Sequence, residues 1–310
     1  MIRSMYSGIS GLKNFQTKLD VIGNNIANVN TYGFKKGRTV FKDLISQTTA
    51  GASAASQTRG GVNAKQIGLG AQLSAIDTIH SGGSLQTTNN TLDLAVSGDG
   101  FFIVADGDAN PPTAFSNPSY TRAGNFYMDS NGYLVNSDGK YVYGFSDPAA
   151  QDLTSADTDY ELAQDVVSLT TTPDGVLPSA SGSEIESPIR IPTNAQSMSI
   201  SQNGTVTFVD STGELRYAGQ LVMAKFANAA GLQKAGSNYY QESPNSGTPF
   251  YSVGTEQGMG SVNSGFLEMS NVDLSEEFTD MIVAQRGFQA NTRIITTSDQ
   301  ILEELVNLKR

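Results

Sequence analysis

Apolar side chains follow a helical spacing at the two ends of the chain and a different spacing between them. Near the N-terminus they advance in alternating steps of three and four residues, and near the C-terminus they recur at every seventh residue. Such spacing places an apolar stripe along one side of a helix. We therefore expect helices over about 4–28 and from about 273 onward, with stripes made of Met5, Ile9, Leu12, Leu19 and Ile26, and of Leu274, Met281, Phe288, Ile295 and Leu302.

The stripe at the N-terminus is wider than one partner helix can cover. Phe15, Ile22 and Val29 add a second apolar row beside the first. Two terminal helices can bury their stripes against each other as a coiled coil, and a wider stripe needs further partners. Most amphipathic helices pack on their own domain, and that interpretation remains open. Because both stripes are terminal and the middle of the chain can fill its own core, the pattern favours packing between copies.

The ends of the predicted helices carry recognisable signals. The first helix should stop in the Asn- and Gly-rich run 28–33, which favours left-handed backbone. Asp273 and Glu276 have the spacing of a capping box at the start of the second helix. Gly287 inside that helix costs about 1 kcal/mol relative to alanine, and we expect it to permit close helix approach.

The middle of the chain has the period of β-strands. Tyr141, Tyr143 and Phe145 alternate, and the apolar runs 101–104 and 221–223 look like buried strands. Four pairs supply the positive φ angles of tight hairpin turns, namely Asp99-Gly100, Asn131-Gly132, Asp138-Gly139 and Asn203-Gly204. We expect a mainly antiparallel β domain.

Two segments stand apart from this domain. Residues 46–61 are low-complexity Ser, Thr, Ala, Gly and Gln, and we expect an irregular connector. Residues 146–189 are acidic and polar, and we expect a small insertion on the outer surface whose ends, Phe145 and Ile189, lie close together.

The expected fold class is α+β. Residues 1–30 with 272–310 form a helical, coiled-coil core domain; 31–70 with 266–271 a connector or arm; 71–145 with 190–265 the β domain; and 146–189 the insertion.

Composition narrows the function classes. The net charge is -11 with a pI of about 4.5, so the chain is repelled by nucleic-acid phosphates and anionic membranes, and neither is expected as a partner. The chain has no cysteine, which excludes disulfides and thiolate metal sites. It has no apolar run long enough to span a membrane and no signal-peptide pattern at the N-terminus. We expect it either to stay in the cytoplasm or to leave by a route that cleaves nothing.

Candidate chemistry is sparse. His80 is the only histidine, and a base or metal ligand there would act alone. Residues 106–110 begin like a calcium loop, but Pro111 stands where that loop needs glycine. We expect no catalytic residue, cofactor or metal site. Paired carboxylates in space remain open, and a secreted β-rich carbohydrate-binding protein or hydrolase is the alternative of a different class.

Both ends also resemble a known family. The run 24–35 (NNIANVNTYGFK) and the runs 271–278, 281–286 and 297–302 resemble the terminal signatures of the bacterial flagellar rod and hook proteins. Residues 92–102 and 120–126 also resemble this family, whereas the resemblance is weak in residues 146–189. The residues that carry the N-terminal motif are Asn24, Asn25, Ala27, Asn28, Asn30, Gly33 and Phe34.

The resemblance implies a structural subunit and no enzyme. The hook members look most similar. The distal rod protein is the alternative, because the segment 146–189 is too short for the outer domain that many hook proteins carry. A hook subunit would polymerise with itself into a flexible extracellular tube, a universal joint that transmits torque from rod to filament. The resemblance further implies export through the flagellar type III apparatus without a cleaved signal. The implied neighbours are the distal rod protein, the hook cap and the hook-filament junction proteins.

Overall fold

The computed structural model describes residues 2–55, 59–107, 115–147, 149, 160–161 and 185–308. The chain divides into two compact units. Unit 1 consists of residues 1–29, 36–79 and 272–310, and unit 2 of residues 30–35 and 80–271. The structure is a mixed α/β fold with two long helices and mostly antiparallel strands.

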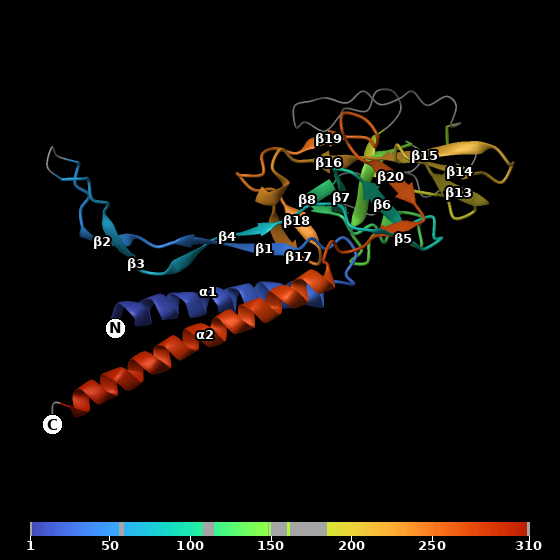
Figure 1. Cartoon of the computed structure of the whole chain (residues 1–310). Helices are drawn as coiled ribbons and strands as arrows, with labels where there is room; N and C mark the ends of the chain where they lie inside the picture. The colour runs from blue at the N-terminus through green and yellow to red at the C-terminus, as the bar shows by residue number, and fades with distance from the viewer. Residues whose placement is uncertain are drawn as a thin grey trace. The chain divides into compact units, whose positions relative to one another are not determined.

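Unit 1 contains both helices and a β arm. Its elements are α1 (Ile2–Ala27), β1 (Gly37–Asp43), β2 (Ser46–Ala50), β3 (Lys65–Gly68), β4 (Ala71–Thr78) and α2 (Leu274–Asn307). The helices lie side by side (Figure 1). They are antiparallel, since Gly8 lies against Ile295 whereas Lys18 pairs with Asp280. The backbone amides of Ser275 and Glu276 donate to the carboxylate of Asp273, which confirms the predicted N-cap.

Glycines in both helices allow α1 and α2 to approach closely. A Cβ atom on Gly287 would lie 2.5 Å from the ring of Phe15, and one on Gly11 would lie 2.9 Å from the amide of Asn291. The expected close approach at Gly287 is therefore confirmed. Only glycine at these positions lets the two backbones come this near without moving a neighbouring side chain.

The β arm corrects the expectation of an irregular connector for residues 46–50, the first part of the segment 46–61. β1 pairs with β4 from Gly37–Thr78 to Asp43–Ala71, and β2 pairs with β3. The pairing extends to a bridge between Ser53 and Val62. An antiparallel ladder needs only backbone donors and acceptors, so residues 46–50 form a strand although most of their side chains are exposed.

Unit 2 is built on one large antiparallel sheet. In the described part of the chain this sheet has thirteen strands, and its main path runs β13-β14-β15-β11-β7-β8-β18-β17. Its strands are β7 (Phe101–Gly107), β8 (Phe115–Thr121), β9 (Tyr127–Met128), β10 (Leu134–Val135), β11 (Tyr141–Ser146), β12 (Ile185–Pro188), β13 (Ser197–Ile200), β14 (Thr205–Val209), β15 (Leu215–Leu221), β16 (Met223–Lys225), β17 (Gln233–Gly236), β18 (Tyr239–Gln241) and β19 (Phe250–Ser252).

Smaller elements complete unit 2. β5 (Leu85–Thr87) pairs with β21 (Phe266–Glu268), and β6 (Leu94–Ser97) pairs with β20 (Ser261–Ser264). A short 3-10 helix, η3, spans Ala229–Gly231. The strand that β21 forms brings the residues just before α2 into unit 2 rather than into the expected arm. Residues 71–78, expected in the β domain, belong to unit 1 because β4 pairs with β1.

The large sheet buries apolar side chains on both faces. Along β7, Phe101 and Ile103 belong to one core cluster, and Phe102 and Val104 belong to the other. Alternation along a strand sends neighbouring residues to opposite faces, so a continuous apolar run marks a strand that is covered on both sides. The predicted buried strand at 101–104 is confirmed. Residues 221–223 are buried as expected, but they join two strands, since β15 ends at Leu221 and β16 begins at Met223.

The insertion contributes to this core at its ends. β12 pairs with β11, which confirms that the ends of the insertion lie close together. The ring of Tyr160 is buried and packs edge-to-face on Phe208 at 5.2 Å. The expectation of a purely peripheral insertion is therefore wrong at these positions. The rest of the insertion lies outside the described residues, and so does its expected place on the outer surface.

Candidate assembly interface

The predicted stripe of α2 flanks its contact with α1 instead of forming the centre. The α2 residues buried against α1 are Glu277, Ala284 and Ser298, which lie at heptad spacings. Met281, Ile295 and Leu302 of the predicted stripe are half-buried, whereas Leu274 and Phe288 are exposed, Phe288 by 37%. Within one copy, α1 thus covers the stripe only in part.

The stripe of α1 is covered to a similar degree. Ile22, from the second predicted row, is fully buried. Met5, Leu12, Leu19 and Ile26 are half-buried. Ile9 is 49% exposed. The predicted apolar positions therefore keep surface that α2 of the same copy does not cover.

A second apolar row on α2 escaped the sequence prediction. Exposed apolar residues recur at intervals of seven: Ile294 and Ile301 on α2, and Leu308 directly after its last residue. Ile282 and Val283 are also more than half exposed. The heptad spacing of Ile294, Ile301 and Leu308 is visible in the sequence, but the prediction included only one stripe on this helix. Exposed apolar side chains that line up along a helix are typical of an interaction surface.

The asparagines of the N-terminal motif fix the end of α1. The side-chain amide of Asn25 donates to the Gly37 carbonyl at 2.9 Å and accepts from the Gly37 amide at 2.9 Å. The Nδ2 of Asn28 donates back to the carbonyl of Asn24. Ala27 is exposed at the last position of the helix, and Asn30 is exposed beyond it. The motif thus sets the local geometry where α1 ends and β1 begins.

Gly33 and Phe34 belong to unit 2. Gly33 has a φ of +69°, and its amide donates to the carbonyl of Glu268 at 2.8 Å. A Cβ atom at this position would lie 2.6 Å from the backbone of Arg122 and Ala123. The ring of Phe34 is buried, with the ammonium of Lys234 5.1 Å from its centre. Both motif residues therefore anchor the segment 30–35 inside unit 2.

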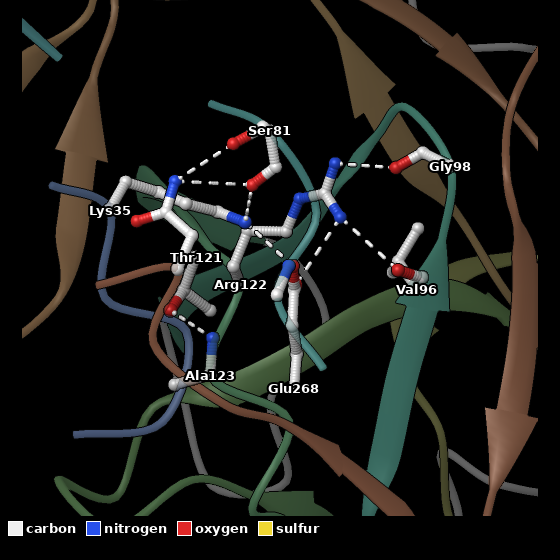
Figure 2. A network of polar contacts seen from close by, with 10 residues as sticks. Lys35, Ser81, Val96, Gly98, Thr121, Arg122, Ala123 and Glu268 are labelled. Atoms are coloured by element: carbon white, nitrogen blue, oxygen red, sulfur yellow. Dashed lines mark hydrogen bonds and ion pairs between the residues drawn. The ribbon is translucent and has the colours of Figure 1, made fainter. Parts of the chain in front are cut away.

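Three charged side chains that sequence reasoning missed meet beneath this segment. Lys35 Nζ lies 2.6 Å from Glu268 Oε1, and Arg122 Nη1 lies 3.3 Å from Glu268 Oε2 (Figure 2). The side chains of Lys35, Arg122 and Glu268 are 0%, 4% and 1% exposed. Lys35 also donates to the Ser81 carbonyl at 2.8 Å. We call these three residues the buried triad.

The charges of the buried triad are also held by hydrogen bonds with backbone groups of several segments of unit 2. Arg122 donates to the carbonyls of Val96 and Gly98, and the amide of Gly83 donates to Glu268 Oε1 at 2.9 Å. Burial lowers the pKa of Lys35, and the adjacent Glu268 carboxylate partly offsets this by raising it. Lys35 was the last residue of the quoted motif, but its partners are far away in sequence.

His80 lies beside the triad, among aromatic rings. Its ring packs edge-to-face on Phe101 and Tyr240. Burial, followed by the positive charges of Lys35, Arg122 and Lys234, lowers the pKa of His80 to about 4. Across the described residues no cluster of His, Asp and Glu has the arrangement of a metal site. None of the described helices is long and apolar enough to cross a membrane.

Comparison with known proteins places these features in a family. Three family descriptions match: "Flagella basal body rod protein" over residues 5–35, "Flagellar hook protein FlgE/F/G D1 domain" over 95–208, and "Flagellar basal body rod FlgEFG protein C-terminal" over 263–308. The matches at the two ends contain most of α1, its motif and all of α2. The middle match contains most of the large sheet.

Similar proteins cover the whole chain. The flagellar basal-body rod protein FlgG of Bacillus subtilis is 52% identical over 311 residues, with all of both chains covered. The flagellar hook protein FlgE of Borreliella burgdorferi is 34% identical over an alignment of 452 positions, again with both chains covered. FlgG of the same organism is 35% identical over 313 residues, with both chains covered. The chain therefore belongs to the family of bacterial flagellar rod and hook proteins.

Proposed function

We propose that the chain is a structural subunit that polymerises into the distal, tubular segment of the flagellar rod. The observation that carries this choice is the co-linear similarity to FlgG of Bacillus subtilis, in which 311 aligned positions cover both chains completely. A chain of 310 residues aligned over 311 positions needs almost no gaps. Similar proteins of equal length share the same set of segments along their whole course.

The hook subunit is the second candidate. FlgE of Borreliella burgdorferi covers the whole chain, but over an alignment of 452 positions it leaves more than a hundred of them opposite gaps in this chain. The hook reading would make the tube a universal joint that bends while transmitting torque to the filament. The segment 146–189 is too short for the extra domain that many hook proteins carry.

The polymer's core would consist of α1 and α2 from many copies, packed as coiled coils around a central channel. Support comes from the apolar rows on α2 that α1 leaves exposed. The copies would be exported by the flagellar type III apparatus without a cleaved signal and would join their own kind end to end. Hook or rod proteins would adjoin at the ends of the segment, with the hook cap and hook-filament junction proteins beyond. The role is structural, without catalysis.

Electron microscopy of basal bodies from a strain that lacks the gene separates the two candidates. If the chain builds the distal rod, the basal bodies should end in a short rod with no hook. If it builds the hook, they should carry a rod of full length. Basal bodies with an intact rod and hook would contradict both.

A pair of substitutions on α2 tests the helical core. Phe288→Asp places a charge in the predicted stripe, and we expect the purified chain to lose sedimentable polymer under salting-out conditions. Gln289→Asp puts the same charge on the neighbouring exposed position and serves as the control. Equal polymer yield from both variants would contradict a role for the stripe.

A further inference from the structure

A cavity of about 310 Å³ lies in unit 1 between the second half of α1, the start of β1, the end of β4 and the first turns of α2. It is partly open to solvent, and its lining includes three basic and three acidic side chains. An apolar cavity of about 150 Å³ is large enough for a benzene ring. This polar cavity therefore has room for a planar group of the size of a guanidinium.

The carboxylate of Glu277 takes no part in the ion pairs around the cavity. Lys36 pairs with Glu276 at 2.7 Å, and Lys18 pairs with Asp280 at 3.3 Å. Glu277 is only 6% exposed, and its carboxylate accepts a hydrogen bond from the neutral Asn25 amide at 3.2 Å. Within the described residues no cation lies within ion-pair distance of Glu277. All three basic residues of the lining are paired with other carboxylates, since Arg38 also lies 3.5 Å from Asp77.

Burial makes this carboxylate costly in a single copy. Desolvation raises the pKa of Glu277, although Asn25 and Lys36 counteract the shift. A buried charge without a counter-ion is unfavourable unless a partner supplies one. A cation from outside would both fill the cavity and neutralise the surplus charge. A bound metal ion is a poor candidate, because the described part of the chain holds no group of acidic residues arranged for one.

Helix α2, which carries Glu277, also carries two arginines on its opposite face. Arg286 and Arg293 are exposed and stand one heptad apart. Arg286 follows the buried Ala284 by two residues, a rotation of about 200° around the helix, so both arginines lie on the face turned away from α1. A guanidinium is planar, always charged and weakly hydrated, which suits it to a buried carboxylate. Cavity and arginines lie on different faces, as a head-to-tail contact between copies requires.

We propose that this cavity receives the guanidinium of Arg286 or Arg293 from α2 of a second copy, which pairs with Glu277. The contact is heterologous: each copy offers its cavity to one neighbour and its arginine to another, so it can repeat along a polymer. The proposal rests on the proposed polymerisation. It adds a charged lock to the apolar contacts and fixes how far one α2 is displaced along the next.

The test uses purified full-length chain and measures the critical concentration for polymer by sedimentation. Glu277→Gln should raise it at least about tenfold, because it leaves the partner guanidinium buried without a counter-charge. Either Arg286→Gln or Arg293→Gln should raise the critical concentration by the same factor as Glu277→Gln. Combining that arginine variant with Glu277→Gln should raise it little further. Glu303→Gln, at an exposed carboxylate of α2, is the charge-matched control and should change nothing.

The stability of the monomer separates this role from a purely internal one. Because ionised Glu277 is disfavoured by burial, Glu277→Gln should leave the thermal midpoint of the monomer unchanged or raise it while weakening assembly. A lowered midpoint, or no effect of either arginine variant, would overturn the proposal. So would a critical concentration that Glu277→Gln does not change. A wild-type chain that never polymerises would instead refute the proposed function.

Discussion

The buried triad offers the most demanding test of the fold. Glu268→Gln keeps the shape of the side chain and removes its charge. In the native chain this carboxylate faces two cations, and its Oε1 also accepts from the Gly83 amide. The variant would leave the side chains of Lys35 and Arg122 buried together without a counter-ion. Removing one partner of a buried ion pair costs about 3–5 kcal/mol.

This loss is a large share of the free energy of unfolding of a typical domain. Domains are typically stable by about 5–15 kcal/mol, so Glu268→Gln should lower the urea midpoint severely. Lys35→Met should cost less, about 1–3 kcal/mol, because Glu268 keeps Arg122 and Gly83 as partners. The matched control is Asp77→Asn, which breaks an ion pair with Arg38 whose side chains are 41% and 63% exposed. An exposed pair is worth about 0–1 kcal/mol.

Urea unfolding of the full-length monomer, followed by far-UV circular dichroism, measures these free energies. The chain has no tryptophan and 12 tyrosines, so tyrosine fluorescence provides a second probe. The expected order of losses is Glu268→Gln, then Lys35→Met, then Asp77→Asn. If Glu268→Gln cost no more than the exposed control, the triad would not hold unit 2 together and the reasoning would be refuted.

Three further predictions concern other parts of unit 2. Gly33→Ala should cost about 2–5 kcal/mol in urea unfolding, since it adds left-handed strain and a backbone clash, whereas Gly139→Ala, with open space around it, should cost about 1–2 kcal/mol; equal losses would contradict the clash. The pKa of His80 is lowered from about 6.5 in the unfolded chain to about 4 in the folded chain, so the stability that its neutral form provides is complete above pH 6.5 and is lost as pH falls toward 4. His80→Gln should therefore make the urea midpoint depend less on pH between 6.5 and 4. An unchanged pH dependence would contradict this. Tyr160→Ala should cost about 3–5 kcal/mol by emptying the space against Phe208, and a loss below about 1 kcal/mol would contradict a role of this ring in the core.

The sequence predicted the features that depend on neighbours along the chain. The two helices, the Asp273 cap and the buried strand at 101–104 follow from spacing and local hydrogen bonding. The turn glycines follow in the same way: Gly132 and Gly204 both have positive φ angles. In each case the determining residues lie within a few positions of one another.

The features that were missed depend on residues far apart or on the backbone alone. Lys35 and Glu268 are separated by 233 positions, and nothing in either local sequence names the other. The arm strands β2 and β3 gave no alternating pattern because neither face is buried. The polarity of the insertion predicted a peripheral segment, yet the ring of Tyr160 is buried and β12 pairs with β11.

The choice of residues between α1 and α2 links the fold to assembly. A seam built from Gly8, Gly11 and Gly287 holds the helices close but buries little apolar surface, and apolar burial contributes only about 25 cal/mol per Å². The larger side chains of both helices remain partly exposed beside that seam. A pair optimised for its own stability would have placed Phe288 and Ile301 at the centre. Their position outside it is understandable if other copies cover them, so that the helices gain most of their stability only in the polymer.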